Sequence, residues 1–305
     1  MLRLEAAQQT ARIDEVELGG QIGERAPALV GSIFYSGHRI VHDPMEGTFD
    51  TEEAERLLAV EADLSSQYAI PHIVDVIGET EKAMEKYIDF VVAATDAPFL
   101  VDATNPRVRL AGLKQAARVH ALHRAIYNSI DPHSTKEELE SIAEIGCKSA
   151  VILAFSVDSV FPADRVGLLQ GGDARQGLLQ MASQAGIENT LIDVGVLDLP
   201  STSWSAQAVF EVKNRLGLPT GCAPSNAFYT WKKQRRIQSP VLEACGSAVL
   251  TMPLFYGADF ILYGPIANAS WVFPGAAVAS AMVAYGGRVE RRRPATKDHP
   301  LYRLF

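Results

Sequence analysis

Residues 99–131 read FLVDATNPRVRLAGLKQAARVHALHRAIYNSID, and this stretch decides the fold class. Its first apolar run, residues 99–103, predicts a buried strand. Asn105 followed by Pro106 is typical of a helix start, because Asn caps free N–H groups and proline fits the first turn, so a helix is expected to about residue 119. A second apolar run at 125–129 predicts another strand. Strand, helix and strand in this order form the βαβ unit of a parallel sheet.

The same unit recurs along the whole chain. Eight apolar runs that do not alternate strictly with polar residues predict strands covered on both faces. They span residues 28–35, 72–77, 99–103, 125–129, 150–155, 190–194, 220–225 and 260–263. Helices are expected at 51–68, 80–93, 106–119, 134–146, 173–185, 203–216, 240–256 and 274–285. Eight such units predict an α/β fold, the (β/α)8 TIM barrel. An open, doubly wound sheet is the alternative, but the first strand lacks the GxGxxG turn that usually accompanies it.

The barrel is expected to form a single domain over residues 28–305. Residues 1–27 precede the first unit, and Gly19-Gly20 suggests a small hairpin that covers the bottom of the barrel. With 305 residues, of which 48% are hydrophobic, the chain can bury a large core. No apolar run reaches the roughly 18 uninterrupted residues that span a bilayer, so direct membrane insertion is not expected.

Composition argues against several functional classes. The net charge of −8 disfavours binding to nucleic acid phosphates. The three cysteines lie far apart without CxxC spacing, which predicts neither a disulfide framework nor a thiolate zinc site and favours a reducing, cytoplasmic location. His38, His42 and Asp43 form only a loose ligand pattern, so no protein-bound metal is expected.

Polar side chains lie at or just beyond the ends of four predicted strands. They are Asp102, Asn128, Asp193 and Asn226. Because the carboxyl ends of barrel strands meet at one mouth, we expect these side chains to lie together. Carboxylates and carboxamides offer acceptors and donors to a flat, polar heteroaromatic ligand. The alternative is that each side chain only caps the helix that follows it.

Four segments also resemble a known enzyme family. VDATNP (101–106), IYNSI (126–130), LIDVGVLDLP (191–200) and CAPSNA (222–227) are similar, in order and strand placement, to motifs of the pterin-binding methyltransferase barrels. GSIFYSGHRIVHDPMEGTFD (31–50) and HPLYRLF (299–305) extend the resemblance over nearly the whole chain to one branch. That branch is the H-subunit family of tetrahydromethanopterin S-methyltransferase, with its bacterial methylcobalamin:tetrahydrofolate methyltransferase relatives of the glycine betaine type.

This resemblance implies methyl transfer between N5 of a reduced pterin and the cobalt of a corrinoid (cobalamin) carried by a partner protein. Asn226 matches the catalytic asparagine beside N5, and Asp102, Asn128 and Asp193 match the residues that hold the pyrimidine half of the pterin. Asp75 and Glu79 are candidates for a proton relay, unless they only support neighbouring groups or cap a helix.

The remaining expectations concern the pterin and the partners. Tetrahydrofolate, with its 5-methyl form, is the preferred substrate; the alternatives are tetrahydromethanopterin, as in a membrane-associated complex, and a non-catalytic pterin-binding or scaffold subunit. A basic run is expected in the loop after the predicted strand at 220–225, beside the mouth, where it contacts either the pterin tail or the partner, or is only solvated surface. It comprises Lys232, Lys233, Arg235 and Arg236. The predicted helices at 240–256 and 274–285 are apolar nearly all round, which favours a homodimer.

Overall fold

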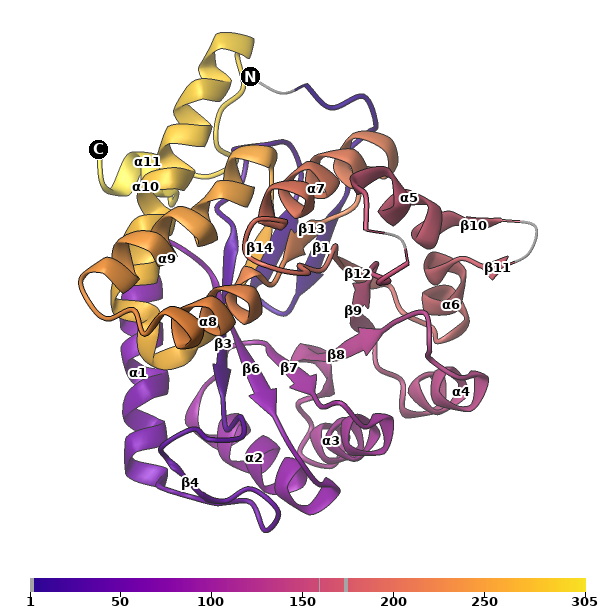
Figure 1. Cartoon of the computed structure of the whole chain (residues 1–305). Coiled ribbons are helices and arrows are strands. Elements are labelled where there is room, and N and C mark those ends of the chain that lie inside the picture. The colour runs from indigo at the N-terminus through magenta and orange to yellow at the C-terminus, as the bar shows by residue number, and fades with distance from the viewer. Residues whose placement is uncertain (1–2, 159, 173–174) are drawn as a thin grey trace.

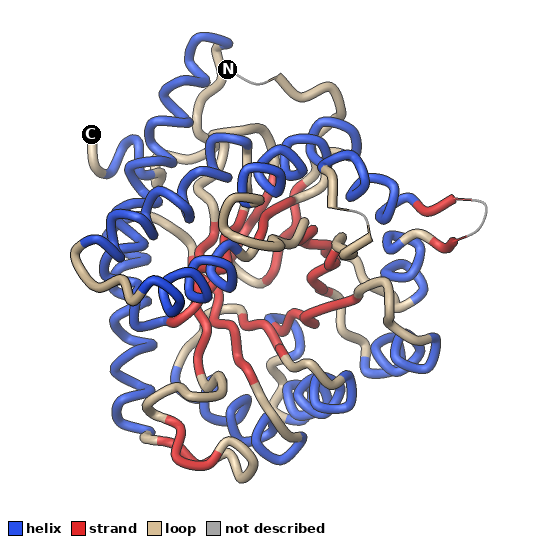
Figure 2. Tube along the Cα trace, viewed as in Figure 1, coloured by secondary structure: helices blue, strands red, loops and turns tan. Residues whose placement is uncertain are grey.

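The structure, a computed structural model, describes residues 3–158, 160–172 and 175–305. Eight parallel strands close into a barrel in the order β12-β13-β14-β3-β6-β7-β8-β9, with helices around it (Figures 1 and 2). This confirms the predicted TIM barrel. Each of the eight predicted runs forms one barrel strand. The strands are β3 (Ala28–Ile33), β6 (His72–Ile77), β7 (Phe99–Asp102), β8 (Ala125–Ile130), β9 (Ser149–Leu153), β12 (Asn189–Asp193), β13 (Thr220–Cys222) and β14 (Phe260–Pro265).

The helices follow the sequence signals at most of their ends. Asn105 caps its helix by accepting from the N–H of Arg107 at 3.0 Å, and Asp50 accepts from the N–H of Glu53 at 3.0 Å. The helices are α1 (Thr51–Tyr68), α2 (Glu81–Ala94), α3 (Pro106–Arg118), α4 (Lys136–Ile145), α5 (Pro162–Gln170), α6 (Leu178–Gln184), α7 (Thr202–Leu216), α8 (Pro224–Arg235), α9 (Val241–Thr251), α10 (Ala269–Gly287) and α11 (Pro300–Arg303).

Three helices, α5, α8 and the short α11, were not predicted. The expected strand at 220–225 ends at Cys222 because Pro224 opens α8 as a first-turn proline. The basic run therefore lies at the end of a helix, with Lys232 and Lys233 inside α8, and not in a loop. The expected helix at 173–185 was also wrong at its start: 175–176 form strand β11 (Arg175–Gln176), which pairs with β10 (Gly171–Gly172), and 173–174 lie outside the described residues.

A small antiparallel hairpin lies at the amino-terminal end of the barrel. Its strands are β1 (Thr10–Ile13) and β2 (Val16–Gly19), so the turn lies between them and not at the expected Gly19-Gly20. Ala11, Ile13 and Leu18 pack in one buried cluster with inward-facing barrel residues. A second short ribbon, β4 (Val41–Asp43) with β5 (Thr48–Phe49), belongs to the segment between β3 and α1.

The barrel interior changes from apolar to polar along the strands. Side chains alternate between the two faces of a strand, so residues two apart both point inward. One set of inward positions packs as an apolar cluster that includes Val30, Ile73, Leu100, Ile126 and Leu191. Two residues further along the same strands stand Ser32, Asp75, Asp102, Asn128 and Asp193. The carboxyl end of the barrel thus carries a polar layer on an apolar floor.

One helical segment corrects the expectation drawn from uninterrupted apolar runs. Ile266–Glu290, which contains α10, is long and apolar enough to cross a membrane by length and composition alone. Of its most apolar stretch, 56% is buried inside the protein, and α10 packs on α1, α9 and α11. These properties are those of a core helix of the barrel, and the segment is weak evidence for a membrane span.

Candidate functional site at the carboxyl end of the barrel

Three carboxyl groups crowd the polar layer. Asp102 lies on β7 beside Asn128 of β8, and the two residues are register partners. Burial raises the pKa of Asp102 to about 6; Arg109 opposes this rise, and the negative charge of Asp193 adds to it. Asp102, Asn128 and Asp193 are thereby placed in one layer, as expected.

Asp75 adds a third carboxyl group to this layer, deeper than the others. Its Oδ2 accepts a hydrogen bond from Ser32 Oγ at 2.6 Å, and its Oδ1 is buried without a donor among the described residues. Burial raises the pKa of Asp75 well above its ordinary value, and the charge of Asp102 raises it further. Asp75 therefore holds its proton more tightly than Asp102 does, and a protonated Asp75 can donate to the Asp102 carboxylate.

Asp193 is held by a backbone hydrogen bond and lies near a buried arginine. It is 6% exposed, and its Oδ1 accepts from the N–H of Gly195 at 2.7 Å. Burial raises its pKa to about 6, while the Gly195 hydrogen bond and the charge of Arg165 lower it. Arg165 is itself buried on α5 and donates from Nε to the carbonyl of Val194 at 3.0 Å. The guanidinium is thereby fixed near the carboxylate.

Asn226 lies on the same end of the barrel but outside the layer. It is exposed in the first turn of α8, and its carbonyl accepts from Thr230 Oγ1 at 2.9 Å. It lines a hollow of about 360 Å³ between α8 and the loop after β12, together with residues 196–200 and Trp231. Asn226 therefore borders the mouth from the rim, whereas the carboxylates line its floor.

The other expected site residues lie apart from the layer. Glu79 is exposed between β6 and α2, and its charge acts on Tyr87 of α2, whose pKa it helps to raise. Within the basic run, Lys232 is half-buried over the ring of Tyr229 at 5.5 Å, while Lys233, Arg235 and Arg236 are exposed. Asp75 thus joins the site and Glu79 does not.

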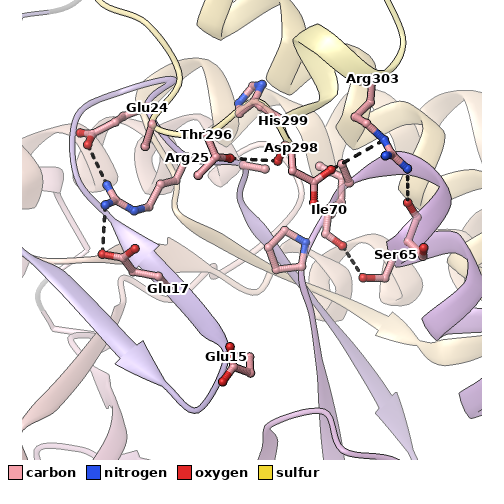
Figure 3. Close-up of a pocket in the computed structure, with 15 residues that line it drawn as sticks. Glu15, Glu17, Glu24, Arg25, Ser65, Ile70, Thr296, Asp298, His299 and Arg303 are labelled. Carbon is pink, nitrogen blue, oxygen red and sulfur yellow. Dashed lines mark hydrogen bonds and ion pairs between the residues drawn. The ribbon is translucent and has the colours of Figure 1, made fainter.

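A further hollow of about 520 Å³ lies at the opposite end of the barrel. The β1–β2 hairpin, the end of α1 and the carboxyl-terminal segment enclose it (Figure 3). Arg25 forms ion pairs there with Glu17 at 3.0 Å and Glu24 at 2.9 Å, and Arg303 lies 3.7 Å from Asp298. These pairs are local in sequence, but Arg303 also donates to the carbonyl of Ser66 at 3.4 Å and so joins the carboxyl-terminal segment to α1, which favours a stabilising role at this end.

Sequence reasoning missed two residues that support the carboxylates. Ser32 could have been found, because it is a polar residue within the apolar run ALVGSIFY and two positions after an inward Val30. Arg165 could not, because it lies on α5, which the hydrophobic pattern did not reveal.

Comparison with known proteins identifies the family. The chain matches the family described as tetrahydromethanopterin S-methyltransferase MtrH subunit over residues 6–291. The chain belongs to this family. It is 34% identical to the tetrahydromethanopterin S-methyltransferase H subunit of Methanothermobacter thermautotrophicus, with 100% of both chains covered, and 34% identical to that of Methanopyrus kandleri, with 96% of each covered. A Methanosarcina acetivorans protein, named as the H subunit of a putative methyltransferase, mtx, is 33% identical, with 99% of each covered.

The MtrH family assignment makes the chain a methyltransferase of the pterin-dependent class, as the sequence analysis expected.

Solved structures of dihydropteroate synthases share the barrel. The Yersinia pestis enzyme has a TM-score of 0.63 at 14% identity, covering 90% of this chain and 99% of its own. The Coxiella burnetii enzyme has a TM-score of 0.63 at 15% identity with the same coverage. At such low identity this likeness concerns the fold alone.

Proposed function

We propose that this MtrH-family chain transfers a methyl group between N5 of a tetrahydropterin and a corrinoid carried by a partner protein. The single observation that carries the proposal is the polar layer of Asp102, Asn128 and Asp193 on an apolar floor. The 2-amino group and N3–H of a reduced pterin are donors, and the two carboxylates are acceptors at the floor of the mouth. Asn128 supplies both a donor and an acceptor to the same ring edge.

Asn226 is the residue that we propose acts at N5. When the N5–methyl bond breaks, its electron pair stays on nitrogen, and a tertiary amine leaves poorly without a proton or strong hydrogen bond. The side-chain amide of Asn226 can donate to N5 as that charge develops, which stabilises the transition state more than the ground state. The corrinoid supplies the cobalt that receives or donates the methyl group. In the reverse direction the same contact orients N5 as the nucleophile.

Asp75 is proposed to act as a proton reserve behind Asp102. Its buried Oδ1, which lacks a donor among the described residues, and its raised pKa favour the neutral acid, whose O–H can donate to Asp102. This donation keeps the Asp102 carboxylate oriented toward the ligand. Glu79 is exposed beyond the end of the same strand, and it is not part of this proposal.

Tetrahydromethanopterin is the pterin that we favour. Curated relatives at 34% identity carry its name, whereas the sequence analysis preferred tetrahydrofolate. Both pterins share the reacting ring and differ in their substituents and tails, so the polar layer accepts either. The residues that distinguish tetrahydromethanopterin from tetrahydrofolate must therefore lie outside the polar layer.

A second copy of the chain is proposed to cover the exposed face of α10. Val278, Met282 and Tyr285 of α10 recur at helical spacing and are 45%, 59% and 60% exposed, and Val289, in the turn just after the helix, is 87% exposed. These residues form one apolar patch and not isolated surface hydrophobics. Such a patch favours a symmetric contact with the same patch on a second copy of the chain. In this arrangement residues 28–305 form the methyltransferase barrel and residues 1–27 its amino-terminal cover, and the dimer works in the cytoplasm.

Anaerobic methyl transfer tests the proposal. Free methylcobalamin serves as the methyl source, with tetrahydromethanopterin and tetrahydrofolate as separate acceptors, and calorimetry measures pterin binding. Asn226→Ala should lower turnover by about 100-fold while changing the pterin Kd little, and Gln67→Ala, an exposed carboxamide on α1, is the control. Unchanged turnover in Asn226→Ala refutes its role, and pterin binding without any methyl transfer supports the scaffold alternative instead.

A further inference from the structure

The strand order fixes the direction in which a bound pterin points. The proposed pyrimidine anchors lie on β7, β8 and β12, and in the closed ring the strands across from them are β14 and β3. In a pterin the substituent at C6 is on the ring far from the 2-amino group and N3. A pterin held by its pyrimidine edge therefore sends its C6 substituent toward β14 and β3.

A hollow of about 520 Å³ lies on that side of the mouth. The segment after β3, the start of α1, α8 and the segment after β14 enclose it. Gly264, at φ +82°, brings the end of β14 against α8, because a side chain there would meet Tyr229 and Ser225. The lining of the hollow includes Tyr35, His38, Arg39, Tyr229, Lys232 and Asn268.

Positive charge in this hollow exceeds negative charge. Both acidic residues of its lining are already engaged: Asp50 caps α1, and Glu53 forms an ion pair with Arg56 at 2.6 Å. Neither Arg39 nor Lys232 makes an ion pair within the described part of the chain. The hollow thus carries a net positive charge in a protein whose net charge is −8.

The aromatic side chains of the hollow are held in place by hydrogen bonds and stacking. The His38 ring stacks on Tyr35 with centroids 4.5 Å apart, and its Nδ1 accepts from the N–H of Phe34 at 3.2 Å. Burial lowers the His38 pKa to about 4, so the ring is neutral and carries its proton on Nε2. Tyr229 Oη accepts from Asn268 Nδ2 at 2.6 Å. Prior ordering of these rings lowers the entropy cost of binding.

We propose that this hollow binds the C6 substituent of the tetrahydropterin, with an aryl group against Tyr35 and Tyr229 and an anionic terminus at Arg39 and Lys232. The inference rests on the proposed function and adds to it the place where one pterin is distinguished from another. Of the four residues in the basic run, it assigns a tail contact to Lys232 alone.

Binding of pterins with and without a tail tests the proposal. Calorimetry under anaerobic conditions compares tetrahydromethanopterin and tetrahydrofolate with 6-methyltetrahydropterin, which has the ring but no tail. Arg39→Ala and Lys232→Ala should each weaken binding of at least one tailed pterin by about 10- to 100-fold and leave 6-methyltetrahydropterin unchanged. Lys136→Ala, which removes an 83% exposed charge on α4, is the matched control. Arg39→Lys should recover part of the loss, since it restores the charge without the guanidinium fork.

The outcomes separate this inference from the function on which it rests. If the wild-type protein binds 6-methyltetrahydropterin but the two alanine variants bind every pterin normally, the tail site is wrong and the methyltransferase proposal stands. Equal weakening of tailed and tail-less pterins also overturns the tail site, because it indicates a disturbed barrel. If the wild-type protein binds no pterin, the proposed function fails and the tail site fails with it.

Discussion

Replacement of Asp193 by Asn should stabilise the protein and weaken its ligand binding at the same time. The pKa of Asp193 is raised from its ordinary value of 3.8 to about 6 by burial, at 6% exposure. Each tenfold change in proton affinity corresponds to about 1.36 kcal/mol. At a pH above both values, the ionised Asp193 carboxylate therefore lowers the free energy of unfolding by about 3 kcal/mol. Asn keeps an oxygen for the Gly195 N–H but removes the negative charge near Arg165. We therefore expect the Asp193→Asn variant to have a free energy of unfolding about 1 to 3 kcal/mol higher than the wild-type protein at pH 8.

The sign of the pH dependence makes this expectation testable. The folded state binds the Asp193 proton more tightly than the unfolded chain, so the stability that Asp193 contributes falls as pH rises from about 4 to about 6. The variant's advantage should be near zero at pH 4 and reach its full size above pH 6. Thermal unfolding at several pH values measures it, with the exposed Asp63→Asn as control. An advantage at pH 4 that vanishes at pH 8 refutes the reasoning.

Pterin affinity provides the second half of the same test. If the Asp193 carboxylate accepts hydrogen bonds from the ligand, as proposed, Asp193→Asn should raise the pterin Kd by about 10- to 100-fold at pH 8. Wild-type binding should weaken as pH falls below about 6, where Asp193 and Asp102 take up protons. A wild-type Kd that is constant between pH 5 and pH 8 contradicts a role for these carboxylates as acceptors.

Three further outcomes follow from the same contacts. Asp75→Asn, which keeps an acceptor for Ser32 but removes the acid, should shift the midpoint of the pH dependence of pterin binding; an unmoved midpoint excludes the proton reserve. Gly31→Ala should destabilise the barrel by about 2 kcal/mol or more in thermal unfolding, because the new methyl group meets the buried, hydrogen-bonded pair Glu61 and Tyr263. Gly167→Ala is the control and should not destabilise the barrel, because the space around Gly167 is open. Met282→Asp should convert a dimer to a monomer in light scattering, and an unchanged mass places the dimer contact elsewhere.

The errors of the sequence analysis have local physical causes. Helix α8 was missed because its sequence, PSNAFYTWKKQR, opens with a proline after an apolar run and carries no wide apolar stripe. Only its buried face on β14 shows why it forms, and that face depends on Gly264. The same omission explains the misplacement of Asn226: it was expected just beyond the predicted strand at 220–225, together with the other polar groups, but it lies in the first turn of α8 and so at the rim.

The sequence by itself determined the architecture and the floor of the site. Apolar runs and capping residues are local signals, and the two-residue period of a strand brings Asp102, Asn128 and Asp193 to one face once the strands are counted. Only the tertiary structure decided which carboxyl group keeps a proton, because the burial of Asp75 comes from strands that are distant in sequence. It also decided where positive charge gathers beside the mouth, since Arg39 and Lys232 are 193 positions apart and come together only in the hollow between the segment after β3 and α8. Burial and charge neighbours are properties of the packed barrel, and no local pattern encodes them.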